Sequence, residues 1–223
     1  MMAEQATEKL SKRKAAPRGH CTLDFERAAW ELGAARVAGL DEVGRGPLFG
    51  PVVAAACILP HDYPIAELRD SKQLSAKKRE RLAAELRAGA AAWAVAEVSA
   101  GRIDEINIRQ ASREAMRLAV EQLAPPPEWI LVDGNCAIEW EGPQQTVVHG
   151  DALVASIAAA SILAKVHRDA MLERWALEYP QYLLEKNKGY PTAEHLEALR
   201  RHGPTPLHRR SFAPVRRALA EHR

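Results

Sequence analysis

The stretch RVAGLDEVGRGPLFGPVVAAACIL, residues 36–59, decides how the fold begins. Residues 36–43 are rich in apolar and branched side chains and predict a strand, and residues 52–59 are almost wholly apolar and predict a second one. Between them, residues 44–51 hold three glycines and two prolines, which predict a turn. Consecutive strands joined by a short turn pair antiparallel, so the sequence predicts a hairpin here.

Downstream of this hairpin, predicted strands alternate with predicted helices. Further strands are expected at residues 92–99, 129–132 and 146–148, and helices at residues 76–87, 102–123, 152–178, 192–201 and 215–220, with Ser75 as the N-cap of the first helix. This order predicts an α/β fold, a mixed sheet with helices packed on it.

The chain divides into three parts by pattern. Residues 1–35 mix charge, Ala and Pro without a sustained period, and we expect a mobile N-terminal arm that holds a short helix near residues 23–32. Residues 36–180 form the predicted core of sheet and helices, and residues 181–223 form a helical, basic C-terminal segment.

Length and composition exclude several classes of protein. The chain has 223 residues, of which 47% are hydrophobic and 27% charged, as expected for a globular domain with its own core. No window is apolar enough for a transmembrane helix, and the N-terminus lacks the apolar stretch of a secretory signal. The odd number of cysteines, three, with no CxxC pair, argues against a disulfide scaffold or a zinc ribbon and favours the cytoplasm. No heptad or apolar stripe is evident, so we expect a monomer.

Positive charge gathers at the C-terminus of a chain whose net charge is only +2. After residue 198 a single acid, Glu221, accompanies seven arginines, namely Arg200, Arg201, Arg209, Arg210, Arg216, Arg217 and Arg223. This distribution suggests contact with a polyanion. Taken alone, a solvated helix face is the better interpretation.

Four acidic residues lie within or directly beside segments that are otherwise apolar. Asp41 and Glu42 lie within an apolar strand, Asp133 ends another, and Asp151 precedes the long Ala-rich helix. Buried carboxylates are costly unless they are paired or bound to a cation, and oxygen ligands of this kind suit Mg²⁺ or Mn²⁺. Two of the four have a simpler explanation than metal binding: Asp151 is suited to cap the following helix, and Asp133 is suited to an ordinary turn. The adjacent pair in the strand has no such alternative.

Beside the acidic pair, Gly44-Arg45-Gly46 forms a turn whose backbone groups are exposed for close approach. Such a turn can contact a sugar–phosphate backbone, and the arginine within it can reach a phosphate. The simpler interpretation, which is favoured for this tripeptide alone, is a tight hairpin turn.

Five motifs in order resemble those of the ribonuclease HII family, the type 2 ribonucleases H. They are residues 38–55, AGLDEVGRGPLFGPVVAA; residues 70–75, DSKQLS; residues 131–134, LVDG; residues 150–169, which begin with Gly-Asp and continue into the predicted long helix; and residues 188–192, KGYPT. The resemblance spans residues 36–213 and implies an RNase H-like fold with a helical C-terminal part.

The same resemblance implies an endoribonuclease that cuts the RNA strand of RNA–DNA hybrids and single ribonucleotides embedded in duplex DNA. It implies that Asp41, Glu42, Asp133 and Asp151 are catalytic and bind divalent Mg²⁺ or Mn²⁺, two per active site, and that the products carry 5′-phosphate and 3′-hydroxyl ends. It also implies that Gly44, Arg45 and Gly46 read the 2′-OH and that Tyr190 packs on the next deoxyribose.

Other residues support weaker expectations. Lys72 and Lys165 are candidate phosphate contacts, and Asp169, farther along the same predicted helix, is expected to form a structural ion pair. His149 stands where the family more often has lysine, which leaves less positive charge near the site unless the imidazole is protonated.

Two other functions remain open at this stage. A structure-specific DNA nuclease or resolvase would keep the fold, but the Gly-Arg-Gly turn and the Tyr190 motif argue against it. A non-catalytic nucleic-acid-binding protein is a further alternative, although four carboxylates would hinder binding of a polyanion unless they held metal.

Overall fold

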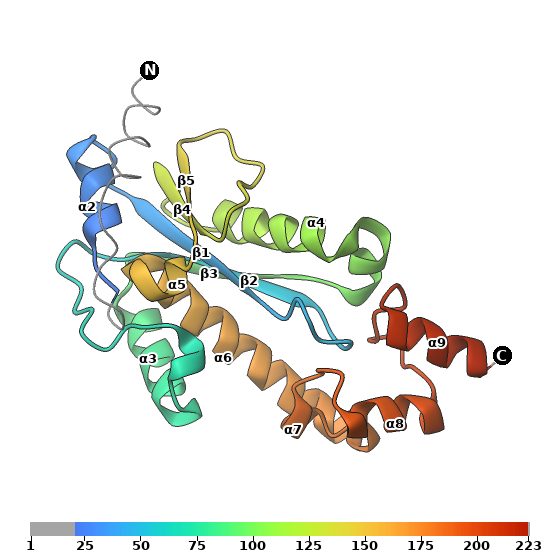
Figure 1. The fold of residues 1–223 in the computed structure, drawn as a ribbon. Helices are drawn as coiled ribbons and strands as arrows, with labels where there is room; N and C mark the ends of the chain where they lie inside the picture. The colour runs from blue at the N-terminus through green and yellow to red at the C-terminus, as the bar shows by residue number, and fades with distance from the viewer. Residues whose placement is uncertain (1–20, 223) are drawn as a thin grey trace.

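The computed structural model describes residues 21–222, which form one five-stranded mixed sheet with helices on both faces (Figure 1). The sheet has the order β3-β2-β1-β4-β5. Its strands are β1 (Val37–Val43), β2 (Val52–Ile58), β3 (Ala92–Val98), β4 (Trp129–Asp133) and β5 (Gln144–Val147). The predicted fold class is confirmed, and the last strand begins earlier in the chain than expected.

The predicted hairpin is the centre of this sheet. Strand β1 pairs antiparallel with β2, with Asp41 opposite Ala55, and parallel with β4, with Leu40 opposite Val132. Because β1 and β4 are parallel, their carboxyl ends meet at the same edge of the sheet. This register brings the acidic pair of β1 and Asp133, the last residue of β4, to one edge.

Two helical layers bury the two faces of the sheet. Helix α4 (Ala100–Glu121) covers one face, and α3 (Ala76–Gly89) and α6 (Ala155–Glu178) cover the other (Figure 1). The approach of α6 to β1 is very close, since a Cβ on Gly39 would lie 2.2 Å from the backbone of Ser156 and Ile157. The small side chains of α6 and this glycine explain how the helix reaches the central strand.

Two expected helices are each broken in two. Helix α4 is interrupted at Asn107, whose φ of 67° lies in the left-handed region. The stretch expected as one helix from residue 152 is α5 (Gly150–Leu153) followed by α6, with Val154 extended between them. Val154 takes part in a bridge with Thr22, a contact between distant segments that local helical periodicity cannot foresee.

Part of the expected N-terminal arm belongs to the core. Helix α2 (Asp24–Glu31) forms where a short helix was predicted, and Cys21 and Leu23 are buried against α3 and α6. The buried Glu26 carboxylate accepts a hydrogen bond of 2.8 Å from the Ser156 N–H at the start of α6. Residues 21–35 of the expected arm are therefore part of the folded structure, and residues 1–20 lie outside the described part of the chain.

The C-terminal segment packs on the turn of the hairpin. It comprises a 3₁₀ turn, η2 (Pro180–Tyr182), and the helices α7 (Leu184–Asn187), α8 (Ala193–His202) and α9 (Ala213–Glu221). Its apolar side chains form one buried cluster with Leu48 and Phe49 of the hairpin turn and Leu172 of α6. The segment thus supports the turn that links β1 to β2. No helix within residues 21–222 is long and apolar enough to cross a membrane.

The arginines of this segment are only partly available to a polyanion. Arg200 and Arg201 both contact Glu197, and Arg209 is fully buried. Among residues 21–222, the exposed arginines of the segment without an acidic partner are Arg210, Arg216 and Arg217, while Arg223 lies outside that range. Several of these charges therefore serve the fold, which favours the simpler interpretation of the basic end.

Candidate active site

The four predicted carboxylates gather at one end of the sheet. Asp41 and Glu42 lie near the end of β1, Asp133 ends the neighbouring strand β4, and Asp151 lies in α5, just after β5. Asp41 is buried, with 7% of its surface exposed, and the other three are half-buried. Their elements are fixed by the sheet register and by the break at Val154, which turns α5 away from the axis of α6.

Each carboxylate has a partner from the protein. The Asp133 Oδ1 accepts a hydrogen bond of 2.7 Å from the Gly150 N–H, which ties β4 to the start of α5. Asp41 Oδ1 accepts from the Glu42 N–H at 2.7 Å, and Glu42 Oε1 pairs with Arg45 at 3.0 Å. Asp151 Oδ2 lies 3.7 Å from the Lys72 ammonium. Backbone N–H groups and the side chains of Arg45 and Lys72 therefore stabilise the cluster.

Burial and mutual repulsion make these acids hard to ionise together. Burial, followed by the charges of Glu42 and Asp133, raises the pKa of Asp41 well above its usual range. Burial also raises the pKa of Glu42, although Arg45 opposes this, and burial and Asp133 raise the pKa of Asp151. A site with so much uncompensated negative charge is stabilised by added positive charge.

The donor chemistry of this cluster fits a hard divalent cation. All four groups offer carboxylate oxygen, the ligand type that Mg²⁺ and Mn²⁺ prefer. Within residues 21–222, no three Asp, Glu, His or Cys side chains are preassembled to hold one ion. Lys72 and Arg45 are bonded to two of the carboxylates instead, so binding a cation would require those pairs to open.

The raised pKa of Asp41 leads to a prediction about stability. A carboxyl whose pKa is higher in the folded than in the unfolded chain favours folding at low pH, and this contribution is lost as pH rises from the unfolded value, about 3.9, through the folded one. Asp41→Asn removes this dependence. In EDTA we expect the variant to melt above the wild type at pH 8, by about 2–4 °C for each kcal/mol gained.

Thermal melts of both proteins in EDTA between pH 5 and pH 8 measure this effect. The advantage of the variant should grow with pH. Glu121→Gln, which removes an exposed acid from the far end of α4, should show no such trend. A variant that melts below the wild type at pH 8 would contradict the assignment of Asp41 as a destabilising buried acid.

The Gly44-Arg45-Gly46 turn lies directly against Tyr190. A Cβ on Gly46 would lie 3.2 Å from the Tyr190 ring, which remains 47% exposed. Gly44 has a φ of +91°, and a Cβ there would lie 2.3 Å from the Arg168 guanidinium. The two elements that the sequence marked as substrate readers therefore form one continuous surface beside the acidic pair.

Two buried arginines, which sequence reasoning did not single out as site residues, hold this turn. Arg209 donates to the carbonyls of Gly44, Arg45 and Gly50, at 2.5 Å, 2.9 Å and 2.9 Å. Arg168 donates to the carbonyls of Phe49 and Lys188, each at 3.1 Å, and so links the hairpin turn to the Tyr190 segment. Neither partner set is visible in the sequence, because both consist of backbone carbonyls from distant segments.

A buried histidine pair holds the backbone of Tyr190. His195 Nδ1 lies 2.9 Å from the Tyr190 carbonyl, and its Nε2 lies 3.1 Å from His208 Nε2. His208 Nδ1 accepts from the Thr205 N–H at 3.0 Å, so His208 Nε2–H donates to His195, whose Nδ1–H donates to Tyr190. Burial lowers the pKa of His208 to about 3, which agrees with this neutral arrangement. Isolated histidines carry no spacing signal that would have revealed it.

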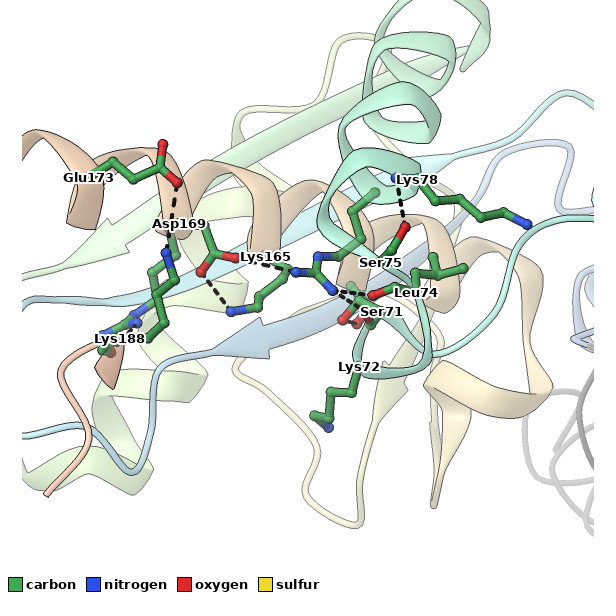
Figure 2. Close-up of polar contacts among 12 residues, drawn as sticks. Ser71, Lys72, Leu74, Ser75, Lys78, Lys165, Asp169, Glu173 and Lys188 are labelled. Carbon is green, nitrogen blue, oxygen red and sulfur yellow. Dashed lines mark hydrogen bonds and ion pairs between the residues drawn. The ribbon is translucent and has the colours of Figure 1, made fainter. Parts of the chain in front are cut away.

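The two candidate lysines differ in their surroundings (Figure 2). Lys72 lies in a 3₁₀ turn, η1 (Ser71–Gln73), and its side chain is 79% exposed beside Asp151. Lys165 is paired with Asp169 at 2.6 Å, and the second carboxylate oxygen of Asp169 lies 3.7 Å from Arg79. The structural ion pair expected of Asp169 is confirmed, and contact of either lysine with phosphate stays a prediction. His149 adopts a left-handed backbone just before α5.

Comparison with known proteins shows the family to which the chain belongs. The sequence profile of the family described as "Ribonuclease HII" matches residues 38–215. A ribonuclease HII of Koribacter versatilis is 52% identical over 200 residues, which is 90% of this chain and 78% of that protein.

Solved structures show the same fold. The crystal structure of the ribonuclease H2 from Pyrococcus horikoshii superposes with a TM-score of 0.72 at 27% identity, covering 84% of this chain and 97% of that one. The structure of Bst-RNase HIII in complex with Mn²⁺ superposes with a TM-score of 0.65 at 21% identity, covering 97% and 80%, and shares the fold. Together with the sequence matches, these findings mean that the chain belongs to the ribonuclease HII family, the metal-dependent endoribonucleases that cleave the RNA of RNA–DNA hybrids and single ribonucleotides embedded in DNA.

Proposed function

We propose that Asp41, Glu42, Asp133 and Asp151 bind two divalent cations, Mg²⁺ or Mn²⁺, and that hydrolysis at this site leaves 5′-phosphate and 3′-hydroxyl ends. The observation that carries this proposal is the convergence of four oxygen donors at one sheet edge, with Asp41 buried among the others. When bound, such cations activate water and stabilise the leaving oxygen. Mn²⁺ is included because it is bound in the related Bst-RNase HIII structure.

The chain's own residues position the substrate in this proposal. Gly44, Arg45 and Gly46 present backbone groups to the ribose 2′-OH, and Tyr190 contacts the sugar of the following deoxynucleotide. The position of the Tyr190 ring, 3.2 Å from where a Cβ on Gly46 would lie, supports this division of roles, because the two readers are then side by side. The Arg45 side chain is 55% exposed and is free to turn to a phosphate once Glu42 is neutralised.

Two lysines are the remaining candidates for contact with the substrate. Lys72 is exposed beside the carboxylates and is proposed to contact a phosphate, whereas Lys165 must first leave Asp169 to do so. The substrates in this proposal are RNA–DNA hybrid and ribonucleotide-containing duplex DNA, bound by a monomer in the cytoplasm. Three free cysteines are consistent with that reducing compartment.

A cleavage assay tests the proposal and separates it from its alternatives. The protein is incubated with a duplex DNA that carries one ribonucleotide, and with an all-DNA control, in Mg²⁺, in Mn²⁺ and in EDTA. We expect metal-dependent cleavage at the ribonucleotide alone, with products that ligate or extend as 5′-phosphate and 3′-hydroxyl ends do. Cleavage of the all-DNA duplex would favour a structure-specific DNA nuclease. Cleavage that persists in EDTA would contradict the metal site.

A further inference from the structure

A hollow lies beside two of the candidate metal ligands, on the side of the sheet that α4 covers. It has a volume of about 390 Å³. Glu42, Arg45 and Asp133 form one part of its lining, and the rest comes from α4 and from the loop after β4, namely Arg109, Ser112, Arg113, Met116, Gly134, Asn135 and Cys136. Any substrate strand whose scissile phosphate meets the carboxylates must pass close to this hollow.

The arginines of α4 differ according to whether they line the hollow. Arg102 pairs with Glu105 and Glu114, and Arg117 pairs with Glu121, so the charges of these two are neutralised on the helix itself. Among residues 21–222, neither Arg109 nor Arg113 pairs with a carboxylate. The free positive charge of the helix is therefore concentrated at the hollow.

The break in α4 places these arginines. The Asn107 side chain accepts hydrogen bonds from the Arg109 and Gln110 N–H groups, at 3.0 Å and 3.2 Å, and so caps a second helical segment that starts beside the hollow. One turn further, Ser112 is 4% exposed, and its buried hydroxyl has no partner. A buried hydroxyl without a partner is costly and is satisfied by a ligand that accepts a hydrogen bond.

We propose that this hollow binds a backbone phosphate of the substrate next to the scissile one, with Arg109 and Arg113 as its cationic contacts and Ser112 as a hydrogen-bond donor. The inference rests on the proposed function, because it takes the carboxylates as the place of cleavage. Phosphate oxygens accept hydrogen bonds from guanidinium and hydroxyl groups such as these. Glu42 and Asp133 line the same hollow and repel a phosphate, which the two arginines offset.

The alternative is that both arginines only brace the loop after β4. Arg109 donates to the Cys136 thiol at 3.1 Å, and Arg113 donates to the Ala137 carbonyl at 2.9 Å. Neither bond uses a charged acceptor. A bracing role predicts lower thermal stability on substitution and no change in how binding depends on salt.

The experiment measures the affinity for an RNA–DNA hybrid over a series of salt concentrations in EDTA, where cleavage is prevented. The double variant Arg109→Gln/Arg113→Gln should reduce the steepness of the plot of log association constant against log salt concentration by about 0.7–0.9, the contribution of one phosphate contact, and each single variant should reduce it by a part of that amount. Arg117→Gln is the matched control, since it removes the same charge from the same helix where Glu121 already neutralises it. Its slope should equal that of the wild type.

A neutral linkage locates the phosphate. Methylphosphonates are placed one at a time around the ribonucleotide, and the position that weakens binding by the wild type but not by the double variant is the one that the hollow holds. Unchanged slopes in both single variants, with or without a lower melting temperature, would overturn the proposal. This readout does not involve metal or turnover, so failure of the proposed cleavage chemistry would appear separately, in the cleavage assay.

Discussion

Asp133→Asn should reduce cleavage at an embedded ribonucleotide by about 10³-fold or more while leaving hybrid binding intact or tighter. Asp133 ends the strand next to β1, and its carboxylate contributes to the raised pKa of Asp41, Glu42 and Asp151. Removing one metal ligand from such a site costs several kcal/mol of transition-state stabilisation, and about 4 kcal/mol corresponds to 10³ in rate. Binding is spared because a negative charge near phosphate is lost. Single-turnover rates in Mg²⁺ and affinities in EDTA measure the two effects separately.

The substitution is nearly isosteric, and its amide can still accept the hydrogen bond from the Gly150 N–H. The control is Glu121→Gln, which removes an exposed negative charge distant from the carboxylate cluster and should leave both quantities unchanged. Turnover at the wild-type rate by Asp133→Asn in Mg²⁺ would exclude this carboxylate as a ligand.

The gathering of the carboxylates could be predicted in part from local patterns, because Asp41, Glu42 and Asp133 lie in or directly after apolar strands. The parallel pairing of β1 with β4, which brings the three acids together, joins segments that are distant in the sequence and was not predicted. The position of Asp151 depends in addition on the break at Val154, which separates α5 from α6. That break is stabilised by the bridge to Thr22, in a segment whose pattern suggested an arm.

The support of the substrate-reading turn could not be predicted in the same way. Arg209 reaches carbonyls more than 150 residues away in sequence, and His195 and His208 satisfy each other and a backbone carbonyl. Hydrogen bonds to backbone groups leave no complementary residue type in the sequence. The break of α4 at Asn107 is similar, because Asn in a helical pattern is ordinary until its side chain caps the following segment.

Tyr190→Ala should reduce cleavage of a single embedded ribonucleotide by about tenfold or more, and should reduce cleavage of a long RNA–DNA hybrid by less. Contacts of an aromatic ring with a nucleotide are worth about 1–3 kcal/mol. At the junction the ring packs on a deoxyribose, and Tyr190→Ala removes this favourable contact. In the uniform hybrid a 2′-OH crowds the ring, so the contact is weaker and the substitution lowers activity less. The ratio of kcat/KM on the two substrates, for variant and wild type, measures the difference.

The structure supplies controls that separate the ring from its scaffold. His195 holds the Tyr190 backbone carbonyl, so truncation of the side chain leaves that hydrogen bond in place. Tyr190→Phe keeps the ring and should keep the substrate ratio of the wild type. Gly46→Ala places a Cβ at 3.2 Å from the ring and should shift the ratio in the same direction as Tyr190→Ala, because the displaced ring no longer meets the sugar. Equal losses on both substrates would leave Tyr190 as a general positioning residue. A lower melting temperature with an unchanged ratio would mean that the ring only packs the turn.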